Sequence, residues 1–113
     1  MTQNRNKLIK LLIGNISNSI VHQILEMAVS KEIMAERYRK ELVNSFEVAL
    51  RYRKMLNPVD KPFLEKDMLY IRTKIIEKSK SELMIRISKG YKNIDLDLVE
   101  KLTEKTLKEL NIL

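Results

Sequence analysis

The sequence predicts an all-α protein: a four-helix, bundle-like single domain with three long helices and one shorter C-terminal helix. Two glycines and two prolines in 113 residues leave long stretches without a helix breaker. Apolar residues recur at steps of three and four, which is the period of an amphipathic helix. Most of the abundant residue types, including Leu, Lys, Glu and Arg, are good helix formers. A chain of this length buries one core, so we expect a single helical domain over residues 1–113.

The first predicted helix covers residues 4–29 and is the most apolar part of the chain. Its main stripe consists of Ile9, Ile13, Ile16, Ile20, Ile24 and Met27. A second row of smaller residues, which lets a neighbouring helix approach closely, consists of Gly14, Ser17, Val21 and Ala28. Since more than half of its circumference is apolar, this helix should be central to the fold or to an oligomer.

Three further helices follow from capping signals and apolar rows. The second covers residues 31–56 and ends at Asn57-Pro58, because a residue before proline is disfavoured in the α region. The third begins near residue 60 or 61 and ends just before Gly90, a typical C-terminal cap. The fourth opens with Asp95 as its N-cap. Its expected inward residues are Val99, Leu102, Thr106, Leu110 and Leu113.

Several chemistries are excluded or disfavoured by composition. The chain has no cysteine, which excludes disulfides and thiolate metal sites. Its one histidine, His22, stands four residues from Glu26, but a divalent metal normally needs three or four protein ligands. No phosphate-binding loop or nucleophile motif is present, so the sequence predicts no metal, no cofactor and no catalytic residue. The protein is more simply a binding protein than an enzyme.

The uncharged run at residues 11–25 is the one stretch that resembles a membrane segment. It falls short of the ~20 residues that span a bilayer, and it contains several polar side chains. We therefore expect no membrane partner and a cytoplasmic location.

Basic side chains give a net charge of +7, and one basic tetrapeptide occurs twice. Arg-Tyr-Arg-Lys at residues 37–40 recurs at residues 51–54, and residues 70–74 are a looser echo. A spacing of 14 residues puts the two copies on nearly one side of a helix, ~21 Å apart. Cations with interleaved tyrosines suit nucleic acid, because Arg and Lys neutralise phosphates and Tyr stacks on an unpaired base. The candidate contacts are Arg37, Tyr38, Arg39, Lys40, Arg51, Tyr52 and Lys54.

A structural explanation of the same repeat stays open. Half-buried tyrosines between long arginine stems are common at the edge of a bundle. The acidic residues Glu36, Glu41 and Glu47 interrupt the row, and Glu36–Lys40 and Glu47–Arg51 have the spacing of helical ion pairs. Arg53 falls on the inward line of the second helix and is a candidate structural residue.

The first helix offers an alternative interaction surface. It carries more apolar and small-residue area than three short partners are expected to cover, which predicts self-association, most simply as a C2 dimer. The candidate residues are Leu8, Leu11, Leu12, Gly14, Ser17 and Val21. The leading hypothesis is therefore a non-catalytic interaction or assembly protein, self-associating or bound to a partner protein. The alternative is a nucleic-acid-binding protein, acting alone or within a larger nucleic-acid-processing complex.

A third hypothesis is an enzyme with a polar pocket. Glu82 and Arg86 continue the apolar line of the third helix, so they point to where a core is expected. Together with His22 they are the available candidates for such a pocket. The simpler explanation is that the helix emerges from the core there, because residues 77–82 contain no apolar side chain.

Overall fold

The computed structural model describes residues 5–29, 32–58 and 63–113, and over these residues the chain forms four α-helices and no strand. The helices are α1 (Arg5–Ala28), α2 (Glu32–Leu56), α3 (Glu65–Ser88) and α4 (Leu98–Glu109). The predicted all-α, bundle-like domain with three long helices and one shorter helix is confirmed. The predicted starting point of the third helix, at residue 60 or 61, lies outside the described residues.

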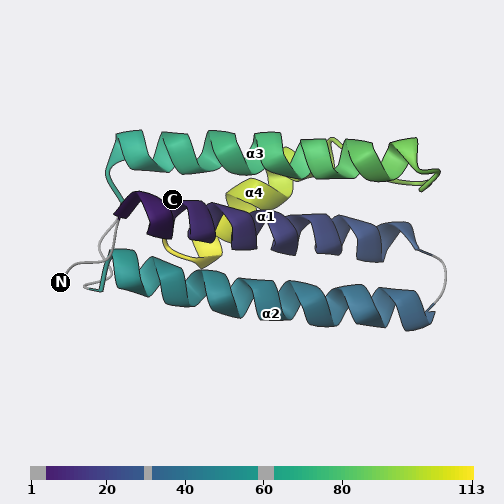
Figure 1. The fold of residues 1–113 in the computed structure, drawn as a ribbon, viewed down its shortest axis with the longest axis horizontal. Helices are drawn as coiled ribbons and strands as arrows, with labels where there is room; N and C mark the ends of the chain where they lie inside the picture. The colour runs from purple at the N-terminus through teal and green to yellow at the C-terminus, as the bar shows by residue number, and fades with distance from the viewer. Residues whose placement is uncertain (1–4, 30–31, 59–62) are drawn as a thin grey trace.

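The three long helices lie side by side in one layer, with α1 in the middle and α4 on one face of the layer (Figure 1). The chain direction alternates from α1 to α2 and again from α2 to α3, so α1 and α3 run parallel (Figure 1). Helix α1 packs against all three other helices, which confirms its predicted central position. Its apolar stripe supplies much of the core, including the fully buried Leu12, Ile16 and Ile20.

Two helices end in the same hydrogen-bonded motif. After α3, Gly90 has a φ of 99°, its N–H donates to the Ile87 carbonyl, and the N–H of Tyr91 donates to the Arg86 carbonyl. After α4, Asn111 takes the same left-handed conformation with a φ of 57°. Both are Schellman-type ends, in which the left-handed residue lets carbonyls of the last turn find donors. The predicted cap at Gly90 is therefore confirmed.

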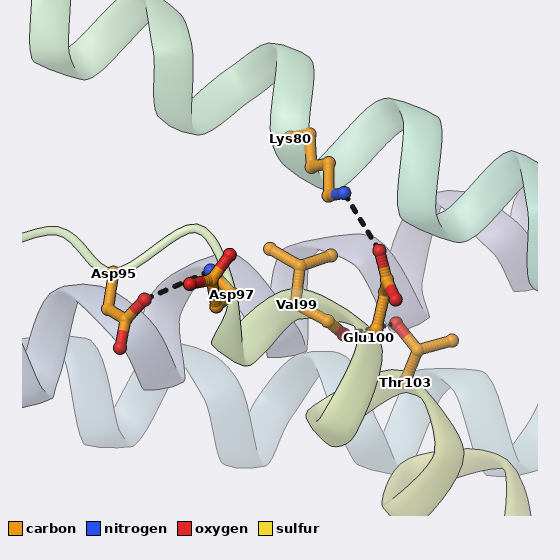
Figure 2. Close-up of polar contacts among 6 residues, drawn as sticks. All are labelled: Lys80, Asp95, Asp97, Val99, Glu100 and Thr103. Carbon is orange, nitrogen blue, oxygen red and sulfur yellow. Dashed lines mark hydrogen bonds and ion pairs between the residues drawn. The ribbon is translucent and has the colours of Figure 1, made fainter.

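The start of α4 differs from its prediction. Asp97, not Asp95, is the N-cap residue, and its side chain makes no capping hydrogen bond. Asp95 instead forms the preceding turn, where its Oδ1 accepts a 3.0 Å hydrogen bond from the Asp97 N–H (Figure 2). An aspartate two residues before a backbone N–H favours such a turn as readily as a helix cap, so the sequence signal fits both structures.

Two ion pairs join α3 to α4, Arg72 with Glu104 and Lys80 with Glu100, and α3 leaves the core near its end. The Lys80 ammonium lies 2.9 Å from the Glu100 carboxylate of α4 (Figure 2). Ser79 is fully buried, so the expectation that residues 77–82 are all solvated is wrong at this position. Its small side chain lets the helix stay in contact with the core. Glu82 is exposed and Arg86 is half-buried, while Leu83 between them is still fully buried. The helix leaves the core only after Leu83, where Met84, Ile85 and Ile87 are exposed.

Helix α1 is long and apolar enough to cross a membrane, judged by length and composition alone. Within the protein, 61% of its most apolar window is buried. This amount of burial is typical of the central helix of a bundle, which needs the same composition.

Candidate nucleic-acid interface

Four of the cations predicted to contact nucleic acid lie free on the surface of α2. Arg37, Lys40, Arg51 and Lys54 are exposed, and none of them forms an ion pair with a described residue. The predicted pairs Glu36–Lys40 and Glu47–Arg51 are therefore wrong. Exposed pairs of this kind gain little free energy, since they immobilise two long side chains in water. The four charges remain available to a ligand.

These cations form two rows along α2. Arg37, Asn44 and Arg51 follow one another at seven-residue steps, so they share one side of the helix. Lys40 and Lys54 form the second row, and exposed Glu47 stands midway between them. The arginine row therefore carries two positive charges ~21 Å apart with a neutral amide between them. The lysine row is interrupted by a carboxylate.

Arg39, a further predicted contact, is already engaged by acidic side chains. Its Nε lies 2.8 Å from Glu26 of α1, and its guanidinium lies 4.0 Å from Glu32. The hydrogen bond to Glu26 is the main reason why the pKa of Arg39 is raised, followed by the charge of that carboxylate. Although Arg39 is exposed, a phosphate would have to compete with Glu26 for it.

Neither tyrosine of the repeat is fully exposed. Tyr38 is 6% exposed and stacks on His22 with ring centroids 5.9 Å apart. Burial, followed by the contact with Tyr91, raises the pKa of its hydroxyl. Tyr52 is half-buried against the core. The prediction that Tyr38 contacts nucleic acid is wrong, because this position lies on the face of α2 that packs against α1.

The residues proposed for a polar pocket are only partly brought together. His22 Nε2 lies 2.7 Å from Glu41 Oε2, so a histidine of α1 contacts this carboxylate of α2. Arg86 lies over the Tyr91 ring, next to Tyr38, whereas Glu82 is exposed. Over the described part of the chain, no group of three or more His, Asp or Glu side chains is placed to hold a metal ion.

Arg53, at the third position of the second tetrapeptide, is buried inside the fold. It is 1% exposed, and its guanidinium donates hydrogen bonds to three backbone carbonyls, those of Asn57, Leu110 and Asn111. It also lies over the ring of Phe63, 5.4 Å from the centroid. Arg53 therefore has the structural role expected from its place on the inward line of α2.

The residues predicted for self-association are largely covered by the chain itself. Leu8, Leu12, Ser17 and Val21 are buried, and Leu11 and Gly14 are half-buried. A Cβ at Gly14 would lie 3.7 Å from Lys78 Nζ, so the small-residue row approaches α3. Packing within one chain thus accounts for the apolar surface on which the self-association prediction rests.

The structure adds a groove between α1 and α3 that the sequence did not reveal. Its volume is about 550 Å³, and its lining residues are Lys10, Ile13, Tyr70, Lys74, Glu77, Lys78 and Ser81. Three lysines against one glutamate make it basic. The echo of the tetrapeptide at residues 70–74 is the one sequence signal for this site. Lys10 could not have been assigned to it, since the pairing of α1 with α3 is a tertiary contact.

A groove of about 610 Å³ between α2 and α4 has a different character. Its charged side chains are Glu26, Arg39, Glu47, Lys105 and Glu109. Because acids outnumber bases there, it does not favour a polyanion.

No family model, characterised protein or solved structure matches the chain. The function therefore has to be inferred from the geometry of these surfaces.

Proposed function

We propose that this protein is a non-catalytic nucleic-acid-binding protein that contacts phosphates through the exposed cations of α2. The observation that carries the proposal is that Arg37, Lys40, Arg51 and Lys54 are all exposed, while no described carboxylate forms an ion pair with any of them. Phosphate contacts by such side chains fix the position of a nucleic acid and carry little sequence information. Binding is therefore largely independent of sequence and falls steeply with salt.

The arginine row is the stronger part of this surface. Arg37 and Arg51 have no carboxylate between them on their side of α2, and a guanidinium can bind a phosphate with two hydrogen bonds. Glu47 lies one turn from Arg51 and two turns from Lys40 and Lys54, so its charge acts on both rows. Glu41, which lies closer to the arginine row, is held by His22 at 2.7 Å.

Self-association through α1 stays a prediction with less support. Four of its six candidate residues are buried within the chain, so a second copy would have to dock mainly on other residues. Light scattering coupled to gel filtration tests it directly, because a mass near 13.4 kDa would contradict a dimer.

The test is a titration of labelled single-stranded and duplex DNA and RNA at low and moderate salt. Changing Arg37, Lys40, Arg51 and Lys54 together to Gln keeps helix propensity and should reduce the logarithmic salt slope by roughly one unit per lost contact. The matched control changes four other exposed lysines to Gln, namely Lys89, Lys92, Lys101 and Lys108.

Both variants lose the same charge, so an effect confined to the α2 variant supports the proposed surface. An equal loss of affinity in the two variants would mean that binding depends only on the net charge of the protein and not on the α2 surface. Absence of salt-dependent binding by the unmodified protein, even at low ionic strength, would overturn the proposed function.

A further inference from the structure

We propose that the groove between α1 and α3 is a binding site for single-stranded nucleic acid, in which Tyr70 stacks on a base and Lys10 and Lys78 hold the backbone. This inference rests on the proposed function and gives it a substrate class. This groove combines basic side chains with an exposed aromatic ring, whereas the α2 surface has no such ring.

Two lysines of the groove, Lys10 of α1 and Lys78 of α3, are free to bind an anion. Lys10 and Lys78 both line the groove, and neither forms an ion pair with any residue in the described ranges. The ammonium group of Lys78 lies near Gly14, where the absence of a side chain leaves space beside α1. Two unpaired ammonium groups from different helices at one groove favour a ligand with phosphates.

Tyr70 provides the aromatic surface. It is 47% exposed, unlike the buried Tyr38 and the half-buried Tyr52, and it lines the same groove as the two lysines. Lys74 Nζ lies 5.9 Å from the centroid of its ring and 3.5 Å from Glu77. Lys74 therefore lies over one face of the Tyr70 ring and is partly neutralised by Glu77, so a base would stack on the opposite face or displace Lys74.

The open groove and the exposed ring favour a single strand over a duplex. The groove has a volume of about 550 Å³ and is widely open to solvent, so a strand can lie along it without being enclosed. The bases of a duplex are paired and stacked, so a tyrosine ring at a groove cannot reach their faces. The bases of a single strand are available, and stacking on tyrosine tolerates any sequence.

The experiment compares fluorescence-anisotropy titrations of an oligothymidylate, a duplex of equal length and an abasic oligomer with the same backbone. Tyr70→Leu should weaken oligothymidylate binding about fivefold or more, and Tyr70→Phe, which keeps the ring, should bind like the unmodified protein. Neither change should alter abasic-oligomer binding, since that ligand has no base to stack.

The lysines are tested by changing Lys10 and Lys78 together to Gln. For a single strand, the salt slope should fall by roughly 0.7 per lost contact. Lys101 and Lys108, exposed on α4, are changed to Gln as the matched control and should cause a smaller reduction. Thermal unfolding followed by circular dichroism shows whether each variant stays folded.

The failure of this inference differs from the failure of the proposed function. If the protein binds oligomers but Tyr70→Leu binds oligothymidylate unchanged, the groove is not the single-strand site, although the α2 surface can still bind phosphates. Stronger binding of the duplex than of the single strand would also overturn the assignment. If no oligomer binds at low salt, both proposals fail together.

Discussion

The guanidinium of Arg53 donates a 2.8 Å hydrogen bond from Nε to the carbonyl oxygen of Leu110, 57 residues further along the chain. A second nitrogen of the same group lies 3.0 Å from the Asn111 carbonyl. These two oxygens follow the last turn of α4, where the helix dipole is negative, so a buried cation is favourable there. One side chain of α2 therefore holds the end of α4, a helix whose main packing contacts are with α1 and α3.

Replacement of Arg53 should destabilise the fold strongly. Arg53→Met keeps most of the apolar stem but removes three hydrogen bonds from a charged donor, so we expect the free energy of unfolding to fall by about 3 kcal/mol. Arg39 occupies the same position in the first tetrapeptide and is exposed, so Arg39→Met should cost less than about 1 kcal/mol. Urea denaturation of both variants measures the difference, and equal losses would contradict the structural role of Arg53.

The two rows of α2 should contribute unequally to nucleic-acid binding. The double change of Arg37 and Arg51 to Gln should weaken binding more than the same change of Lys40 and Lys54, because a guanidinium can bind a phosphate through two hydrogen bonds whereas an ammonium acts as a point charge. Both double variants lose two charges, so net charge cannot explain a difference. Salt-dependent titrations with one oligomer give the comparison, and a larger effect of the lysine pair would contradict the order.

Gly14→Ala should stabilise the protein. A glycine inside a helix is less favourable than alanine by roughly 0.5–1 kcal/mol, and the added Cβ would make an ordinary van der Waals contact at 3.7 Å from Lys78 Nζ. The same substitution at Gly90 should destabilise, since its φ of 99° is one that L-residues rarely adopt. Thermal melts should therefore shift in opposite directions, and two shifts of the same sign would show that one of these environments is misassigned.

Ser79→Ala should also raise stability. The Ser79 hydroxyl is buried in α3 and has no hydrogen-bond partner among the described residues, so burying it costs about 1–3 kcal/mol. Alanine also has a higher helix propensity than serine. Ser81 is exposed on the same helix, so Ser81→Ala measures the effect of helix propensity alone. Ser79→Ala should raise the denaturant midpoint more than Ser81→Ala does. Equal shifts would indicate that the Ser79 hydroxyl is satisfied in solution.

The contact between Lys80 and Glu100 should be visible in a pH titration. The hydrogen bond from Lys80, followed by its charge, holds the pKa of the Glu100 carboxyl below the usual glutamate value. A lowered pKa in the folded state means that the contact stabilises above the unfolded pKa, and that this effect is lost as pH falls through the folded pKa. Carbon NMR of Glu100 should show its midpoint moving upward in Lys80→Met. An unchanged midpoint would mean that the contact is not formed in solution.

The fold could largely be predicted from the sequence because its signals are local. Apolar periodicity, the scarcity of breakers and the cap at Gly90 specify helices without knowledge of their partners. The start of α4 was misplaced, since Asp95 suits a turn and a helix cap equally well. Burial of Ser79 depends on how closely α3 packs on the rest of the bundle, which is a property of tertiary packing.

The candidate site was harder to predict for the same reason. The exposed cations of α2 were predicted correctly. The ion pairs of Arg39 with Glu26 and of Glu41 with His22 each join α2 to α1, so the sequence of α2 alone could not predict them. The α1–α3 groove combines Lys10 with residues 60 or more positions away, and no local pattern carries that information. Residue spacing predicts which side chains align along one helix, whereas predicting a groove requires knowing which two helices pack together.

The position of α1 between α2 and α3 has a consequence for avidity. Both proposed contact surfaces are attached to one packed body, so their separation is fixed by helix packing and requires no linker to be ordered. A strand held at one surface presents its neighbouring phosphates to the other at a high effective concentration. Oligomers long enough to reach both surfaces would thus gain affinity from tethering alone, without any additional contact per nucleotide.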